Sequence, residues 1–121
     1  MAFEEILESI SVPISADLSS KQFYAVVEST IGLAVAGAGV KCLGVLQDNP
    51  DTAGQVANVA VYGVSKVQAT AGAGGAIAKG AAVESNASGV AIVQSTGEVL
   101  GVALEACSSG ETKVISVLLK G

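Results

Sequence analysis

Two glutamates are the first candidates for chemistry in this chain. Glu28 and Glu84 lie in the nearly identical stretches V-E-S-T and V-E-S-N, so a pair of carboxylates related by internal symmetry is conceivable. Such a pair could serve acid and base catalysis. Each glutamate, however, precedes a serine at the expected end of a strand, and the chain has no histidine. We therefore predict that both carboxylates face solvent or close a turn, and that the protein is not an enzyme.

The two cysteines, Cys42 and Cys107, show no spacing typical of a metal or redox site. There is no C-x-x-C pair, and no histidine is available to complete a zinc ligand set. We expect no bound metal. The sequence predicts two free thiols, with a disulfide between them as the alternative.

The glycine-rich segment GAGGAIAKG, residues 72–80, resembles a phosphate-binding loop only in composition. In such a loop a glycine directly precedes the lysine, and a serine or threonine follows it. Here Ala78 precedes Lys79, and Gly80 follows it. We predict a flexible turn and no bound cofactor.

Charge and hydropathy exclude several classes of partner. The 121 residues fit one domain, and a net charge of −5 with 6 basic residues leaves no basic face for nucleic acid. The mean hydropathy of +0.61 raises the question of a membrane span. The best candidate, Ile31–Leu46, is short, contains Lys41 and is cut by four glycines. The acidic start MAFEEILESI also lacks the pattern of a signal peptide, so we expect no membrane partner.

Two parts of the chain resemble each other, which indicates an internal duplication. The L-G-V stretches at residues 43–45 and 100–102 are separated by nearly the same length of chain as the V-E-S stretches at 27–29 and 83–85. We predict pseudo-repeats over residues 27–63 and 83–121. Coincidence is the alternative, because a chain rich in Ala, Gly, Val and Ser often matches itself.

The apolar segments after residue 20 are typical of strands. VANVAVYGV (56–64) and KVISVLL (113–119) are rich in β-branched residues, and GVAIV (89–93) is a short apolar run. Turn-forming clusters separate these segments too often for long helices. The sequence predicts a mainly β fold, with a turn and a strand, or at most one helical turn, over residues 76–83.

The N-terminal segment has a different pattern. Apolar residues recur at helical spacing and glutamates lie between them, which predicts a short helix ended by Val12-Pro13. The apolar stripe consists of Phe3, Ile6, Leu7 and Ile10. We predict an arm over residues 1–20 and a single β domain over 21–121. A helix this short must dock, either on its own domain or on a partner.

The order of several segments resembles a family of small tailed-phage proteins that act as capsid decoration, or cement, proteins. The resemblance covers nearly the whole chain and is most specific in the paired L-G-V stretches and in G-V-S-K-V at residues 63–67. The segments that carry it are residues 10–26, 43–67, 74–93 and 100–119. The resemblance implies a compact barrel of the β-clip or β-tulip kind, similar to the head decoration protein of phage lambda. It further implies a homotrimer on the outer surface of the virion, bound to the major capsid protein after synthesis in the host cytoplasm.

In such proteins an N-terminal arm typically reaches the capsid lattice, which implies capsid contacts in the arm of this chain. Three weak contacts from one trimer become strong when all engage together. The segment Ser11–Ile14 could add an edge strand to a capsid loop. The implied contact residues are Phe3, Ile6, Leu7, Ile10, Val12, Pro13 and Ile14.

Two other functions stay open at this point. A β module on a phage head or fibre that binds cell-surface glycans is the main alternative, although only 3% of the residues are aromatic and sugar sites rely on aromatic faces. The third is an enzyme that uses Glu28 and Glu84. Loss of a defined activity in Glu84→Gln, with folding unchanged, would favour it.

Overall fold

The protein is built from nine strands in the described part of the chain, residues 2, 4–72 and 75–120 of a computed structural model. No helix long and apolar enough to cross a membrane occurs among these residues. The predicted mainly β fold is confirmed. The strands are β1 (Glu5–Pro13), β2 (Ala25–Ser29), β3 (Gly32–Val35), β4 (Gly44–Leu46), β5 (Val56–Thr70), β6 (Ala82–Ser85), β7 (Ala91–Val93), β8 (Gly101–Ala103) and β9 (Thr112–Lys120).

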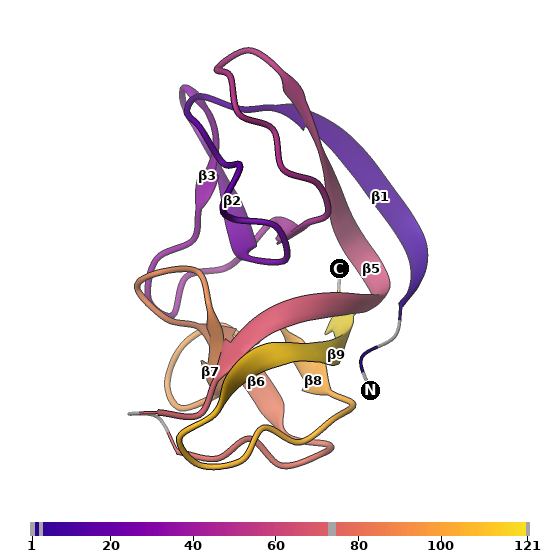
Figure 1. Cartoon of the computed structure of the whole chain (residues 1–121), viewed down its shortest axis with the longest axis vertical. Coiled ribbons are helices and arrows are strands. Elements are labelled where there is room, and N and C mark those ends of the chain that lie inside the picture. The colour runs from indigo at the N-terminus through magenta and orange to yellow at the C-terminus, as the bar shows by residue number, and fades with distance from the viewer. Residues whose placement is uncertain (1, 3, 73–74, 121) are drawn as a thin grey trace.

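The long strand β5 joins two lobes (Figure 1). The first lobe comprises β1 to β4 with residues 56–60 of β5, and it occupies the upper half of the view. The second lobe comprises β6 to β9 with residues 62–70 of β5, and it occupies the lower half. Strand β1 runs along the outside of β5, from the side of the second lobe to the far end of the first.

The second lobe is a closed barrel of five strands. Strand β5 pairs with β9 along one edge and, at Ala69, with Ala91 of β7 on the other. Strand β6 then links β7 to β8, and β8 pairs with β9. The pairings therefore return to β5, which confirms the prediction of a β-barrel.

The first lobe repeats this ring with β1 in the place that β5 takes in the barrel. Strand β1 pairs with β5, β5 with β4, β4 with β2, and β2 with β3. A parallel bridge between Ile14 and Leu33 connects β3 back to the residue that follows β1. The N-terminal segment therefore closes the ring of the first lobe.

Corresponding backbone hydrogen bonds recur in the two lobes at a nearly constant spacing along the chain. The N–H of Phe23 donates to the carbonyl of Leu46, and in the second lobe Gly80 donates to Ala103, both at 2.7 Å. Paired residues of the strands also recur at a nearly constant spacing along the chain. Val26 pairs with Gly44, and Val45 with Ala60, whereas Val83 pairs with Gly101, and Val102 with Leu118.

The prediction of an N-terminal helix is wrong, because residues 5–13 form β1. A helix of about nine residues is marginal in water, whereas an extended segment gains cross-strand hydrogen bonds from β5. The chain between Ser9 and Pro13 also favours a strand, since Ile10 and Val12 alternate with two serines. The predicted strand at 56–64 extends to Thr70, and residues 76–81 form no strand before β6.

Two groups of buried apolar residues form the core. The larger group fills the barrel and reaches into the junction between the lobes, and it includes Ile77, Val83, Ile115 and Val117. The smaller group fills the first lobe, and it consists of Val12, Ile14, Leu18, Val26, Leu33, Leu46, Ala57 and Val59. The first three members of the smaller group belong to the predicted arm. The inner half of that arm is therefore part of the folded body.

Candidate functional site

The predicted arm contacts divide into an exposed and a buried set. Phe3 lies outside the described residues. The exposed residues are Ile6, Leu7, Ile10 and Pro13. Val12 and Ile14 are only 6% and 2% exposed, because they pack in the core of the first lobe. In this conformation a partner can contact the exposed set alone.

Strand β1 is held on β5 by an irregular register. The pairing shifts between Ile6 and Glu8, so Leu7 has no partner in β5 and projects as the extra residue of a bulge. Leu7 is 67% exposed. Opposite this bulge, Gly63 has φ +107°, and a Cβ there would lie 2.5 Å from the carbonyl oxygen of Glu5. Glycine at position 63 therefore permits the close approach of the arm.

A second exposed apolar group lies at the far end of the first lobe. Pro13 pairs with Val56, which is 58% exposed, and the neighbouring β2–β3 turn carries Ile31, which is 80% exposed. Gly32, next to Ile31, packs against the backbone of Pro13, since a Cβ there would lie 3.2 Å from its carbonyl oxygen. We call Pro13, Ile31 and Val56 the apolar end.

The corresponding positions of the second lobe are polar. Ile14 exchanges two backbone hydrogen bonds with residues 54–55, and Ala71 exchanges the same two with residues 110–111. Thr70 directly precedes Ala71, and Thr112 directly follows Glu111. These two threonines therefore stand where the first lobe has Pro13 and Val56. Their hydroxyl oxygens lie 2.9 Å apart in a hydrogen bond. The β6–β7 turn likewise carries Ala87 and Ser88 instead of isoleucine.

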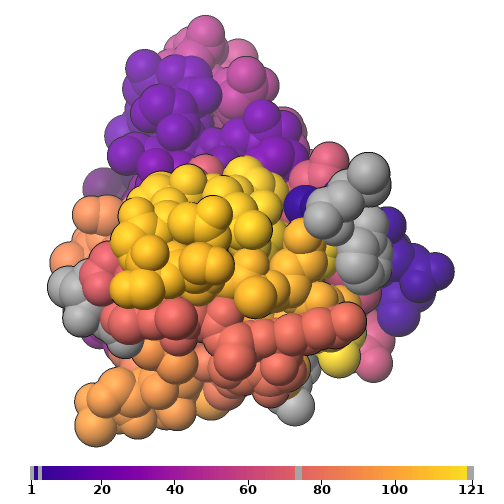
Figure 2. All heavy atoms as spheres, turned by 60° about the horizontal axis from the view of Figure 1, so that its bottom comes forward, coloured from indigo at the N-terminus to yellow at the C-terminus, as the bar shows by residue number. Residues whose placement is uncertain are grey.

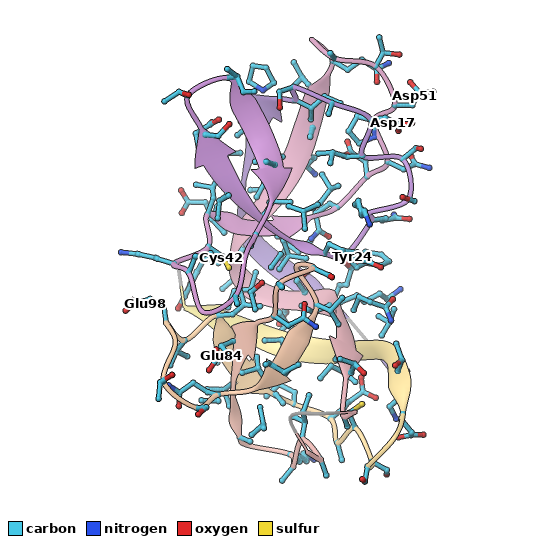
Figure 3. All side chains as sticks on the ribbon, turned by 90° about the vertical axis from the view of Figure 1, so that its left-hand side faces the viewer. Asp17, Tyr24, Cys42, Asp51, Glu84 and Glu98 are labelled. Carbon is cyan, nitrogen blue, oxygen red and sulfur yellow. The ribbon has the colours of Figure 1, made fainter. Side chains whose placement is uncertain are left out.

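A third feature is a pair of aromatic rings beside two lysines. The Nζ of Lys21 lies 4.9 Å from the centre of the Tyr24 ring, and the Nζ of Lys66 lies 5.9 Å from that of Phe23. Phe23 has φ +70°, a left-handed conformation that is rare for a side chain of this size. We call these four residues the aromatic patch. Figure 3 shows Tyr24 at the level where the lobes meet, on the side opposite Cys42 and Glu98.

The two candidate carboxylates do not form a pair. Glu28 is exposed on β2, whereas Glu84 is 7% exposed on β6, and these strands do not pair. The Glu84 carboxylate accepts hydrogen bonds from the backbone N–H groups of Ser95 and Gly97, at 2.6 and 3.2 Å. It therefore fixes the loop between β7 and β8, which is a structural task.

A small cavity lies between corresponding segments of the two lobes. Its volume is about 60 Å³, room for a few water molecules rather than for an organic ligand. The lining residues are Lys41, Cys42, Leu43, Gly44, Val61, Glu98, Val99, Leu100 and Leu119. Burial raises the pKa of the Cys42 thiol to about 11, so this thiol is protonated at neutral pH.

The described residues contain no group of three or more His, Cys, Asp or Glu side chains that could hold a metal ion. Cys42 and Cys107 are both free, as the sequence predicted. Burial, and then the charge of Glu111, raise the pKa of Cys107. Part of the glycine-rich segment, residues 73–74, lies outside the described residues. Gly80, at its end, has φ +93° and forms a turn.

The apolar end and the aromatic patch expose apolar and aromatic side chains that a partner could contact. A family model described as phage cement protein matches residues 6–119. The chain belongs to the phage cement protein family. No curated protein matches the sequence. A phage cement protein has a structural role on the virion capsid, so the exposed apolar groups are candidate contacts with other structural proteins.

Sequence reasoning included Pro13 of the apolar end among the implied contacts but missed Ile31, Val56 and the aromatic patch of this cement protein. The apolar end joins three separate segments of the chain, and no short motif brings them together. The patch had a local signal, since Phe23 and Tyr24 are adjacent in a chain with only 2 Phe, 2 Tyr and no Trp. Lys66, however, comes to the ring of Phe23 only through the fold.

Proposed function

We propose that this cement protein binds the outer surface of a phage capsid as a homotrimer and stabilises the shell. The partner is the major capsid protein. Two free thiols fit synthesis in the reducing cytoplasm of the host. The recurring hydrogen bonds and strand register of the two lobes support a further proposal, that the chain contains two copies of one duplicated unit.

The polarity difference between the ends of the two lobes is the observation that carries the proposed capsid contact. The apolar end exposes Ile31 and Val56 to water, whereas the corresponding end of the second lobe presents threonine and serine. Because both lobes use the same backbone arrangement, the fold does not require the apolar side chains. An exposed apolar group that the fold does not require is typical of a docking surface.

This contact sets the orientation of the protein. The first lobe faces the capsid, and the second lobe faces solvent. Figure 2 looks onto the end of the second lobe, a surface made mostly of residues after about 75, with the first lobe behind it. Ile10 and Pro13 belong to the half of β1 nearer the apolar end and are kept as proposed capsid contacts. Ile6 and Leu7 lie in the other half.

Co-sedimentation with expanded capsids that lack their decoration protein tests the contact. The variant Pro13→Thr/Ile31→Ser/Val56→Thr gives the first lobe the polar residues of the second. We expect it to keep its thermal unfolding midpoint within a few degrees and to bind capsids at least about tenfold more weakly, since three side chains lose apolar burial.

Thr112→Val is the matched control. It adds an apolar residue at the position that corresponds to Val56, on the end that faces solvent, and should leave capsid binding unchanged. Undiminished binding of the triple variant would overturn the proposed contact. A wild-type chain that does not bind such capsids would overturn the proposed function.

A further inference from the structure

The aromatic patch brings two rings and two ammonium groups together on one surface. Lys21, Phe23, Tyr24 and Lys66 are each partly buried, and each ammonium group lies beside a ring. Cation–π contacts of this kind restrict the lysine side chains before any partner arrives. Tyrosine and other aromatic residues supply much of the binding energy in protein interfaces, because they bury large areas with few rotatable bonds.

The fold does not require the side chains of Lys21, Phe23 and Tyr24. The corresponding residues in the second lobe are Ala78, Gly80 and Ala81, and the backbone N–H groups of Gly80 and Ala81 donate as those of Phe23 and Tyr24 do. The backbone N–H of Tyr24 donates to the carbonyl of Lys21 at 3.0 Å, and the backbone N–H of Ala81 donates to that of Ala78 at 3.0 Å. Small residues are therefore sufficient for this turn.

The backbone at Phe23 carries a conformational cost that its counterpart avoids. Phe23 has φ +70°, and Gly80 has φ +93°. A side chain in the left-handed region is strained, whereas glycine is not. Strain that an alternative residue would remove is a reason to look for a function of the side chain. The ring of Phe23 is positioned beside Lys66, so we look for that function at the patch.

The chemistry of the patch specifies its ligand. Two apolar ring faces and two ammonium groups fit a segment that carries carboxylates next to an exposed apolar side chain. Among the described residues, neither Lys21 nor Lys66 forms an ion pair with a carboxylate of its own chain. The outer half of the arm has the complementary composition, with Glu4, Glu5 and Glu8 exposed around Leu7.

The arm cannot reach the patch of its own molecule while β1 stays paired with residues 56–64 of β5. In Figure 1 the arm runs along the right-hand edge of the molecule, and Figure 3, turned by 90°, shows Tyr24 on another face. An arm and a patch on different faces can join copies head to tail. Such contacts close into a ring when the rotation between copies allows it.

We propose that the aromatic patch of one copy binds the acidic outer half of the arm, Glu4–Glu8, of a second copy. The inference deepens the homotrimer proposed above by naming its interface. It assigns Ile6 and Leu7 to a contact between copies, and it leaves the apolar end free for the capsid. Each copy gives one arm and receives one, so a closed ring leaves no patch empty.

Charge reversal in the full chain tests this interface. Light scattering over a range of protein concentrations gives the mass of wild type, of Lys21→Glu/Lys66→Glu, and of Glu4→Lys/Glu5→Lys/Glu8→Lys. We expect wild type to form oligomers that weaken as salt is added, because the paired charges are screened. Each variant should associate at least about tenfold more weakly, since like charges then face each other.

The chain that carries all five reversals is the decisive sample. It restores opposite charges at every contact, also in a ring with an odd number of copies, and should recover the mass of wild type. Lys41→Glu/Lys79→Glu makes the same charge change outside the patch and should leave the mass unchanged. Continued dissociation of the five-fold variant would overturn the interface, as would an unchanged mass in both partial variants.

Phe23→Gly separates the patch from folding. The substitution places the residue of the second lobe at the strained position, so thermal stability should be kept while association weakens about tenfold. Association as in wild type would overturn the role of the ring.

Capsid binding is a separate readout. If the patch variants oligomerise normally but no longer bind capsids, the patch serves the capsid and the inference fails. If wild type forms the inferred oligomer but ignores capsids, the proposed function fails instead.

Discussion

The two lobes share a backbone arrangement but differ in the exposed residues at their ends and in the turn that carries the aromatic rings. Strand register and turn hydrogen bonds recur at a nearly constant spacing along the chain. The first lobe nevertheless exposes apolar residues at its end and carries Lys21, Phe23 and Tyr24 of the aromatic patch, where the second lobe has threonine, serine, glycine and alanine. The second lobe thus shows which kinds of residue are sufficient for the fold, and the first shows which exposed groups the same fold can present in addition.

The shared requirements are clearest at two buried glycines. Gly44 lies in β4 and Gly101 in β8, and each packs against the neighbouring strand in the same way. A Cβ at Gly44 would overlap the carbonyl oxygen of Ala60, and one at Gly101 would overlap that of Leu118. Each would also lie 2.8 Å from the Cγ1 of a valine in the neighbouring strand. The closest conflict is with backbone, which cannot rotate away.

Gly44→Ala and Gly101→Ala are therefore expected to have the largest effects, and equal ones. Each should destabilise the protein by about 4 kcal/mol or prevent folding, because the added methyl group displaces a paired strand. Urea denaturation followed by circular dichroism measures the free energy of unfolding. A protein that tolerates one substitution and not the other would show that the lobes do not share the same packing.

The sequence alone predicted those features of the two lobes that depend on a constant spacing along the chain. Turn signals predicted the β fold, and the two L-G-V stretches do form corresponding strands, β4 and β8. The V-E-S stretches suggested a wrong alignment of the two lobes, because the distance between them along the chain is one residue shorter than the distance between the L-G-V stretches. Val26 and Val83 both pair with the glycines of these strands, so Glu84 corresponds to Val27 and not to Glu28.

The hairpins that contain these stretches also differ in length. Val26 pairs with Val35, whereas Val83 pairs with Val93, so the second hairpin is longer by one position. A shift of one residue moves a side chain to the other face of a strand, so Glu84 is buried and Glu28 is exposed. The prediction of a helix in the arm failed for another reason. Its apolar spacing fits a helix, but pairing with β5, which no local pattern reveals, stabilises a strand.

Ile14→Ala should have the next largest effect. Ile14 is 2% exposed in the core of the first lobe, and the second lobe has Ala71 at the corresponding position. The first lobe is packed around the larger side chain, so its removal should leave a cavity and cost about 3 kcal/mol. Ile10→Ala, on the same segment but 37% exposed, is the control and should cost less than about 1 kcal/mol. Equal losses from both would contradict the division of the arm into a buried and an exposed half.

Gly63→Ala should have a smaller and more local effect. The glycine has φ +107°, and an added Cβ would lie 2.6 Å from the backbone nitrogen of Leu7, so the outer half of β1 should detach from β5. We expect a loss of about 1 to 2 kcal/mol. Hydrogen exchange should show faster amides in residues 5–9 and unchanged protection in β9. If the exchange rates rise throughout the barrel, the outer arm is not a separable element.

Cys42→Val should have the smallest effect on stability at neutral pH. Leu43 and Leu100 both line the cavity, and they donate to corresponding carbonyls, those of Val26 and Val83. Val99, which precedes Leu100, is therefore the counterpart of Cys42. Valine is larger than cysteine by about one methyl group, and the cavity beside position 42 leaves room for it, so the change should stay within about 0.5 kcal/mol by urea denaturation. A larger loss would mean that the thiol has a task that the second lobe lacks.

The pH dependence of this pair gives the finest test of the comparison. Burial raises the pKa of the Cys42 thiol from 9.0 to about 11, so folding disfavours the thiolate. The unfolded chain then loses this proton at lower pH than the folded protein, and the stability that Cys42 contributes below pH 9 should fall as the pH rises through about 11. Cys42→Val should lack that loss, because valine does not titrate. Parallel stability curves for the two proteins between pH 8 and pH 11 would mean that water reaches the thiol as freely in the folded protein as in the unfolded one.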